Sequence, residues 1–235
     1  MKFASLAKFT LVDFPGRVAA TVFTAGCNYR CPFCHNPELV EVTLPPQIDE
    51  EEVLSFLKGR KGRLKGLCIT GGEPTLWGAE LMSFIEKVKA LGFAVKLDTN
   101  GSNPAFLREA LAHRLLDYVA MDVKSSPDKY HLAIGLEREQ TKPILEAVRE
   151  SISILLDSDI PYEFRTTAVP GYVDVEDIPA IGQMIKGARL WAVQRYHKDK
   201  VLKPDACPDS GYDKQTLEEM ARIMAGYVQR TEVRW

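Results

Sequence analysis

The sequence predicts an α/β fold, an open and partial (β/α)6 barrel with a parallel sheet inside and helices outside. Short β-rich apolar runs alternate six times with amphipathic helical stretches, which is the pattern of parallel β/α units. Six units are fewer than the eight of a closed β/α barrel. Polar motifs follow the strand-like runs, where such folds place their functional residues. We expect a single domain over residues 1–235.

The six predicted strands are short apolar runs, at 19–24, 66–70, 94–98, 118–123, 162–169 and 190–196. Helical patterns lie between and after them, at 49–57, 77–91, 104–112, 142–156, 175–186 and 214–229. The second pattern places Leu81, Phe84, Ile85 and Val88 on one face. The third begins with proline, which favours a first helical turn. The tail at 231–235 is expected to add an edge strand.

Composition excludes several functional classes. The net charge of −2 gives no basic surface for nucleic acid or an acidic membrane. The sequence contains no run of 18 apolar residues, so we expect no membrane-spanning helix. The stretch TVFTAGC resembles a lipoprotein cleavage box, but Asp13, Pro15 and Arg17 interrupt the apolar segment that must precede it. We therefore expect a cytoplasmic protein with reduced thiols.

Five polar motifs follow predicted strands 2 to 6, and a cysteine loop follows the first strand. The motifs are TGGEPT (70–75), DTNGS (98–102), MDVKSS (121–126), FRTTAVPG (164–171) and QRYHKDK (194–200). Because the carboxyl ends of parallel strands meet at one edge of the sheet, these motifs are expected to converge on one site.

The cysteine loop, GCNYRCPFCHNP, carries Cys27, Cys31 and Cys34 with the spacing C-x3-C-x2-C. A structural zinc site takes four ligands, and His35 directly follows a cysteine, a poor spacing for one tetrahedron. Of the other cysteines, Cys68 lies inside the second predicted strand, where we expect it to point into the core, and Cys207 lies in a distant polar loop. Three thiolates instead fit a 4Fe–4S cluster with one iron left open for a cofactor, although zinc or a metal-free redox role stays possible.

The motif C-x3-C-x-aromatic-C, formed by the three cysteines and Phe33, resembles the signature of the radical S-adenosylmethionine enzymes. The stretches FPGRVAATVFTAGCNYRCPFCHNPEL, ITGGEPTL and LDTNG are similar to the glycyl-radical-enzyme activating branch. Within that branch, the chain resembles the anaerobic ribonucleoside-triphosphate reductase activating proteins. The resemblance covers nearly the whole chain and implies the partial barrel typical of radical S-adenosylmethionine enzymes.

The resemblance also implies the chemistry. The open iron binds the amino and carboxylate groups of S-adenosylmethionine, and one electron cleaves the cofactor to methionine and a 5′-deoxyadenosyl radical. That radical then takes a hydrogen atom from the substrate. The protein orients the cofactor and excludes competing reactions.

Several residues are candidates to contact S-adenosylmethionine. Gly71 and Gly72 allow close backbone approach to its methionine moiety, because no Cβ intrudes. Glu73 can accept hydrogen bonds from its ammonium group, or it can act as a first-turn acid of the next helix. Phe33 can pack against the adenine, or it can belong to a small loop core. His35 sits beside these residues, and its backbone can contact the adenine.

Polar residues at neighbouring strand ends complete the candidate set. The resemblance places Asp98, Asn100, Asp122 and Lys124 around the ribose and the carboxylate end of the cofactor, and Asp98, Thr99 and Asp122 around a monovalent cation. Two acids and a lysine there can instead form a structural ion pair. Arg165 is expected to meet a charged group such as the cofactor carboxylate. His197 can reach the ribose, or it can be an ordinary surface or core residue.

Three functional hypotheses follow. The first is an activase that installs a glycyl radical on a partner enzyme, with anaerobic ribonucleotide reductase as the expected partner and a flavodoxin or ferredoxin as the electron donor. Residues 36–48 are too short for the ferredoxin-like insertion of some activases. The second is a radical enzyme acting on a small molecule such as a modified purine precursor, with Gln194, Arg195, Lys198 and Lys200 as substrate groups. The third is a non-catalytic iron–sulfur or zinc module, which the GGE motif and the converging strand ends oppose.

Overall fold

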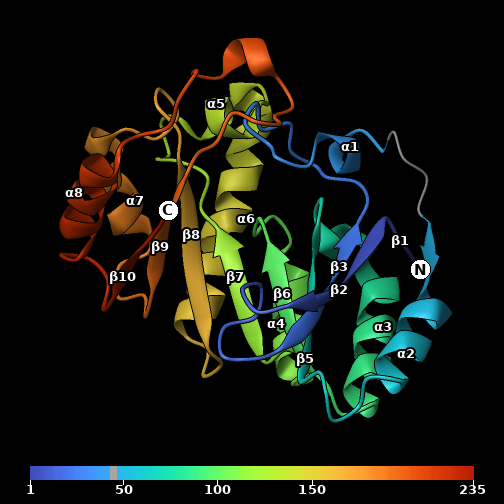
Figure 1. Ribbon diagram of the computed structural model, residues 1–235. Helices are drawn as coiled ribbons and strands as arrows, with labels where there is room; N and C mark the ends of the chain where they lie inside the picture. The colour runs from blue at the N-terminus through green and yellow to red at the C-terminus, as the bar shows by residue number, and fades with distance from the viewer. Residues whose placement is uncertain (43–46) are drawn as a thin grey trace. The chain divides into compact units, whose positions relative to one another are not determined.

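A computed structural model describes residues 1–42 and 47–235 (Figure 1). Residues 43–46, inside the segment 36–48, lie outside the described residues, so the expectation for that segment is not tested there. The chain divides into two compact units. The first contains Met1–Asn28, Glu38–Thr99 and Ala105–Val119, and the second contains Tyr29–Pro37, Asn100–Pro104 and Ala120–Trp235.

Ten strands are assigned in the described residues. They are β1 (Lys2–Phe3), β2 (Ser5–Thr10), β3 (Ala19–Thr24), β4 (Ile48–Asp49), β5 (Gly66–Gly71), β6 (Ala94–Thr99), β7 (Tyr118–Asp122), β8 (Tyr162–Ala168), β9 (Trp191–Arg195) and β10 (Thr231–Arg234). Eight of them form one sheet in the order β10-β9-β8-β7-β6-β5-β3-β2, while β1 pairs with β4. This order has two free ends, so the sheet is open, as expected for a partial barrel.

The helices alternate with the strands along the chain. They are α1 (Pro37–Val40), α2 (Glu50–Lys58), α3 (Gly78–Ala90), α4 (Pro104–Ala112), α5 (Tyr130–Ile134), α6 (Arg138–Leu156), α7 (Ile178–Met184) and α8 (Lys214–Met224), with 3-10 turns η1 (Pro74–Trp77), η2 (Val175–Asp177) and η3 (Pro204–Ala206). Within the described residues, no helix combines the length and the apolar character needed to cross a membrane.

In the first unit, β3 pairs in parallel with β5, and β5 pairs in parallel with β6. Helix α3 packs on β6, and it buries Leu81, Phe84, Ile85 and Val88 completely. This confirms the predicted apolar face of the helix. The strands bury almost all their side chains because a parallel sheet needs cover on both faces.

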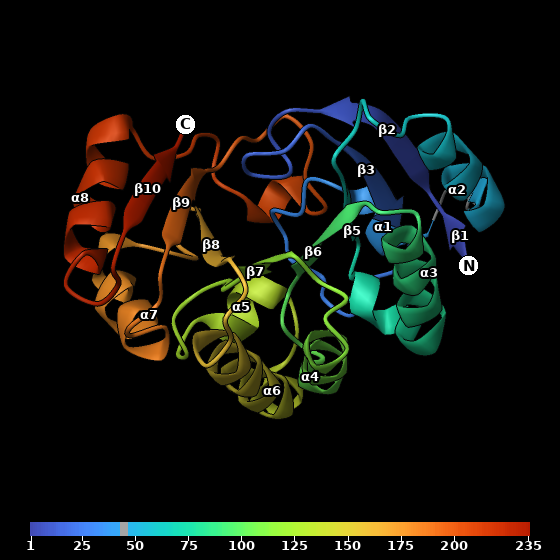
Figure 2. The ribbon, with the colours of Figure 1, turned by 90° about the horizontal axis from the view of Figure 1, so that it is seen from below.

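In the second unit, β8 pairs in parallel with β9, and β9 pairs in parallel with β10. The expected edge strand at the tail is therefore confirmed as β10. Helices α7 and α8 lie against each other, and α8 contacts β9 and β10 (Figure 2). The deepest packing contact of this unit includes Trp191 in β9, which is completely buried and donates a hydrogen bond to the hydroxyl of Thr166 in β8.

The structure differs from the predicted elements in a few places. Strand β2 was missed because its side chains are mostly exposed or half-buried, so no apolar period marks it. The predicted helix at 142–156 begins earlier, at Arg138, because Glu137 and Gln140 form a capping box there. As a consequence, Pro143 lies inside the helix. The predicted helix at 77–91 is preceded by a separate 3-10 turn that starts at Pro74.

Candidate active site

In the first unit, the end of β5 lies against the start of the cysteine loop without room for side chains. The Gly72 amide donates to the Thr24 carbonyl at 2.9 Å, and the Glu73 amide donates to the Gly26 carbonyl at 2.8 Å. A Cβ on Gly72 would lie 2.6 Å from the Gly26 carbonyl carbon, and one on Gly71, whose φ is +126°, would overlap the Thr24 backbone. The two glycines are thus required by the protein's own backbone, a reason that the sequence did not reveal.

Glu73 joins the ends of β5 and β6. Its carboxylate is completely buried, and Oε1 accepts hydrogen bonds from the Thr75 amide at 3.1 Å and the Thr75 hydroxyl at 2.6 Å. The same oxygen accepts a hydrogen bond from the Thr99 hydroxyl at 2.7 Å. Glu73 therefore caps the 3-10 turn η1, close to the structural alternative drawn from the sequence. A charged group fixed by three donors is also pre-oriented for a cationic ligand.

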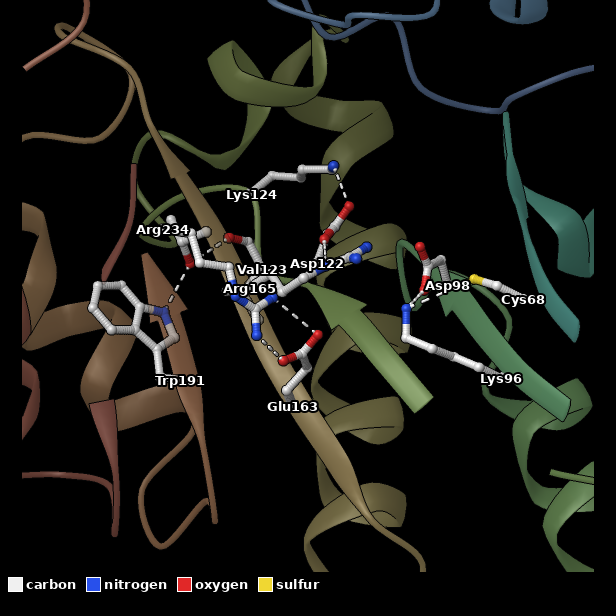
Figure 3. Close-up of polar contacts among 11 residues, drawn as sticks. Cys68, Lys96, Asp98, Asp122, Val123, Lys124, Glu163, Arg165, Trp191 and Arg234 are labelled. Atoms are coloured by element: carbon white, nitrogen blue, oxygen red, sulfur yellow. Dashed lines mark hydrogen bonds and ion pairs between the residues drawn. The ribbon is translucent and has the colours of Figure 1, made fainter. Parts of the chain in front are cut away.

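Asp98, at the end of β6, is paired with a buried lysine of the same strand. The ammonium of Lys96 contacts the Asp98 carboxylate, and it lies 3.8 Å from the sulfur of Cys68 (Figure 3). Cys68 is completely buried in β5, as predicted for a core cysteine. Lys96 was not among the predicted site residues, although a lysine in the apolar run AVKLDT is an unusual feature.

In the second unit, Cys31 and Cys34 share one turn. The Cys34 amide donates to the Cys31 carbonyl at 3.0 Å, and the Lys203 amide donates to the Pro32 carbonyl at 2.9 Å. Cys31 is buried and Cys34 is half-buried. Cys27 belongs to the first unit and is also half-buried. All five cysteines of the chain are free thiols.

Asp122, Lys124 and Arg165 form one polar network that joins the end of β7 to the middle of β8 (Figure 3). Asp122 Oδ2 accepts from Lys124 Nζ at 2.8 Å, and Oδ1 accepts from Arg165 Nε at 2.8 Å. Burial alone would raise the pKa of Asp122, but the charges of Arg165 and Lys124 outweigh it and hold that pKa far below its usual range. The network thus carries two cations and one fixed carboxylate.

Lys124 also lies close enough to the cysteine loop for the loop to affect its pKa. Burial alone would lower the pKa of Lys124, but the negative charges of Asp122, Cys31 and Cys34 raise it above its ordinary value. The ammonium of Lys124 therefore lies near Cys31 and Cys34, and cysteine sulfurs are the ligands of iron–sulfur clusters. The donor set of this unit therefore fits a cluster of that kind.

Tyr130 is a second residue that the sequence analysis missed. Its ring is completely buried in α5. Burial raises the pKa of Tyr130, with the nearby negative charges of Cys31 and Asp122 adding to the rise and Lys124 opposing it. An aromatic residue of a short helix after the MDVKSS motif gave no signal in the sequence, because only the fold brings it near Cys31.

The remaining candidates of the second unit lie in different surroundings. Phe33 is buried and packs edge-on against Tyr172, with ring centroids 5.3 Å apart, which is the loop-core contact considered from the sequence. Asn100 is buried, and its side-chain oxygen accepts from the Ser102 amide at 2.9 Å. His197 is exposed and lies two residues beyond the end of β9. It is close enough to His35 to lower the pKa of that residue.

His35 belongs to the cysteine loop and directly follows Cys34. Burial lowers the pKa of His35, and the positive charges of His197 and Lys124 lower it further, while Asp199 and a hydrogen bond with the Lys200 backbone oppose this shift. In the part of the chain that the structure describes, no three His, Cys, Asp or Glu side chains are grouped around a point that could hold a single metal ion. A four-iron cluster does not need such a group, because each thiolate binds a different iron.

Comparison with known proteins is consistent across most of the chain. The model of the radical SAM superfamily matches residues 21–183. A Methanocaldococcus jannaschii protein, named as a candidate glycyl-radical enzyme activating enzyme, is 30% identical over 98% of this chain and 95% of its own length. The pyruvate formate-lyase-activating enzyme of Staphylococcus epidermidis is 30% identical over 82% of this chain and 79% of its own length.

A relative with another activity is also similar. The 7-carboxy-7-deazaguanine synthase of Thermococcus kodakarensis is 27% identical over 76% of this chain and 74% of its own length.

Solved structures support the fold. A structure of TYW1 with a lysine-pyruvate adduct bound gives a TM-score of 0.65 at 17% identity, covering 88% of this chain and 73% of that chain. Native anSMEcpe with bound AdoMet gives a TM-score of 0.60 at 14% identity, covering 90% of this chain and 61% of that chain. The family model spans most of the chain, and the archaeal relative matches it nearly end to end. The chain therefore belongs to the radical SAM superfamily and, within it, to the branch of glycyl-radical enzyme activating enzymes.

Proposed function

We propose that this protein activates a partner enzyme by installing a glycyl radical on it, with S-adenosylmethionine as the source of the radical. The observation that carries the proposal is the similarity of nearly the entire chain to a protein named for that activity. The donor set around the cysteine loop supports it, because Cys31 and Cys34 lie close together beside the ammonium of Lys124.

In this proposal, Cys27, Cys31 and Cys34 would hold a 4Fe–4S cluster. Together with S-adenosylmethionine, that cluster would supply the radical chemistry that removes a hydrogen atom from the glycine of the partner. The protein's own task is to fix the cofactor and to keep water away from the radical.

The network of Asp122, Lys124 and Arg165 is proposed to hold the carboxylate of the cofactor. Arg165 can present a planar pair of N–H donors, and Lys124 presents a point charge close to the cysteine loop. Asp122 fixes both cations through hydrogen bonds of 2.8 Å, so little side-chain freedom remains to be lost when a ligand binds.

The first unit is proposed to hold the cofactor's amino group. Glu73 is the candidate acceptor, because its carboxylate is fixed by the donors of Thr75 and Thr99. Gly71 and Gly72 are proposed to act through their backbone. The strand-end side chains Asp98 and Asn100, together with Phe33 and His197, are proposed to surround the ribose and adenine.

The predicted monovalent cation near Asp98, Thr99 and Asp122 would compete with protein cations for both carboxylates. Asp122 is already engaged by Lys124 and Arg165. Asp98 is already paired with Lys96.

The partner is proposed to be anaerobic ribonucleotide reductase, with a flavodoxin or ferredoxin as electron donor. The relatives named as pyruvate formate-lyase-activating enzymes make pyruvate formate-lyase the natural competing partner. The two partners are distinguished by offering each to the same activated protein and measuring the glycyl radical.

A second candidate function is a radical reaction on a small molecule such as a modified purine precursor. The similarity to a 7-carboxy-7-deazaguanine synthase favours it. Gln194 and Arg195, at the end of β9, remain its candidate substrate groups. Such an enzyme turns over without any protein partner, whereas an activase needs one.

The test begins with anaerobic reconstitution of the protein, followed by reduction and electron paramagnetic resonance with and without S-adenosylmethionine. We expect a 4Fe–4S signal that changes when the cofactor is added, with 5′-deoxyadenosine formed in the same tubes. Adding the partner should then produce the signal of a glycyl radical on the partner chain. A cluster indifferent to S-adenosylmethionine would overturn the proposal, and turnover of a small substrate without a partner would favour the second function.

A further inference from the structure

We propose that Lys96 is a positioning residue that provides, from within the chain, the positive charge that a monovalent cation would otherwise bring to Asp98, so that S-adenosylmethionine binds without a free monovalent cation. The inference rests on the proposed function, because it concerns the same cofactor site. It goes further by assigning a role to a residue outside the expected set and by predicting a specific independence from added cations.

The strand geometry explains why the lysine lies there. Residues two apart in a strand share a face, so Lys96 and Asp98 project from the same side of β6. Val95 and Leu97, both completely buried, occupy the other side. Lys96 is therefore placed to reach along the strand toward its carboxyl end.

Neighbouring residues form a pocket for the ammonium. Cys68 on β5 is the register partner of Lys96, and its sulfur lies 3.8 Å from Nζ. The ring of Tyr118 lies on another side, with its centroid 5.9 Å from Nζ, within the range of a cation–π contact. The carboxylate of Asp98 completes the set, as Figure 3 shows for the lysine, the cysteine and the aspartate.

Burial makes this ion pair more than an ordinary surface contact. The Lys96 side chain is only 2% exposed, whereas that of Asp98 is 14% exposed. A lysine is almost never buried unless it is paired, and an uncompensated carboxylate at a half-buried strand end is unfavourable. The Lys96 side chain is thus held in the interior, and its partner Asp98 lies near the carboxyl end of β6.

This arrangement performs the electrostatic task of a bound cation. A cation beside Asp98 would neutralise the carboxylate and fix its orientation, and the Lys96 ammonium already does both. A structural ion pair alone would stabilise the fold without affecting how the cofactor depends on salt. The proposed role predicts a specific cation dependence once the ammonium is removed.

The first experiment uses the unmodified, cluster-loaded protein. The dissociation constant for S-adenosylmethionine is measured from the change in the electron paramagnetic resonance signal, at equal ionic strength in KCl, NaCl or tetramethylammonium chloride. We expect the three constants to agree within about twofold, because tetramethylammonium is too large to enter a site made for a small ion. Binding that requires K⁺ or Na⁺ would overturn the inference while leaving the proposed function intact.

The second experiment removes the ammonium by Lys96→Met, which keeps a long apolar stem. We expect the variant to bind S-adenosylmethionine at least about tenfold more weakly in tetramethylammonium, because a charge-assisted contact at Asp98 is lost. Potassium or sodium should restore part of that loss. Lys89→Met is the matched control, because it removes the same charge from the first unit, where Lys89 pairs with Asp117 at 2.7 Å. Its binding should not depend on the cation.

A readout independent of turnover comes from the cluster-free protein. The thermal midpoint of the unmodified chain should not change when K⁺ replaces tetramethylammonium, whereas that of Lys96→Met should rise. If Lys96→Met does not fold, the series on the unmodified protein still tests the predicted independence from added cations, and binding that requires K⁺ or Na⁺ would still overturn the inference. Failure of the unmodified protein to bind S-adenosylmethionine in any salt would count against the proposed function instead. A Lys96→Met variant with unchanged affinity in all three salts would refute the role of Lys96.

Discussion

Replacing Gly72 by alanine tests whether the cysteine loop depends on close backbone contact. Gly72 has a φ outside the left-handed region, so alanine adds no backbone strain of its own. The added Cβ would overlap the Gly26 carbonyl oxygen and would lie 2.6 Å from the carbonyl carbon, whereas ordinary contact begins at 3.4 Å. One of the two segments must therefore move by more than an ångström.

The cost follows from the contacts that this movement disturbs. Overpacking a close-packed region costs about 1–3 kcal/mol. The hydrogen bonds from the Gly72 amide to Thr24 and from the Glu73 amide to Gly26 contribute about 1 kcal/mol each when they are well formed. We expect Gly72→Ala to reduce the free energy of unfolding by about 3–5 kcal/mol. Because Gly26 directly precedes Cys27, cluster assembly should fall as well.

The assay is urea unfolding of the cluster-free protein, together with iron content after anaerobic reconstitution. The urea midpoint should fall by about 1 M or more. Gly59→Ala is the matched control, because Gly59 has right-handed helical backbone angles and an added Cβ would meet only ordinary contacts. That control should be neutral or slightly stabilising. If Gly72→Ala matched the unmodified protein in both midpoint and iron content, the reasoning about close backbone contact would be refuted.

Two further predictions concern the cysteine loop and the ion pairs of Asp122. Replacing any of the three loop cysteines by alanine should abolish the 4Fe–4S signal and 5′-deoxyadenosine formation, whereas Cys207→Ala should affect neither; loss of the cluster in Cys207→Ala with retention in Cys27→Ala would reverse the ligand assignment. Asp122→Asn should destabilise the cluster-free protein by about 2 kcal/mol at pH 7, because Arg165 and Lys124 lose their counter-charge and the site is only partly buried. Since the folded-state pKa of Asp122 is depressed, its contribution is complete above the unfolded value near 4 and is lost as the pH falls further. The stability difference should therefore shrink below about pH 4 in urea titrations, and a difference independent of pH would contradict this assignment.

Local patterns in the sequence were enough to predict the class of fold and to recognise the cysteine motif of the radical SAM superfamily. The alternation of β-rich runs with amphipathic helices predicted six strands, all of which the structure contains, because apolar period is a local property of the chain. The spacing of Cys27, Cys31 and Cys34 indicated a cluster with an open iron, since ligand number is also read from the sequence. The apolar face of α3 and the edge strand at the tail were predicted for the same local reasons.

The tertiary structure decided which residues support the site. Strand β2 was missed because it gains its place from pairing with β3 rather than from an apolar period. Tyr130 gave no signal because its distance from Cys31 depends on the path of the chain between them. Gly72 is needed for contact with Gly26, a residue 46 positions away whose proximity no local pattern encodes.

Lys96 shows the division between the two levels most clearly. Its position two residues before Asp98 was visible in the sequence, and the period of a strand places both on one face. What the sequence left open was the surroundings of the ammonium, where Cys68 from the adjacent strand and the ring of Tyr118 complete the pocket. Local spacing determines which face a side chain occupies, but its charge environment is the sum of contacts from distant segments. Those contacts exist only when the strands have paired.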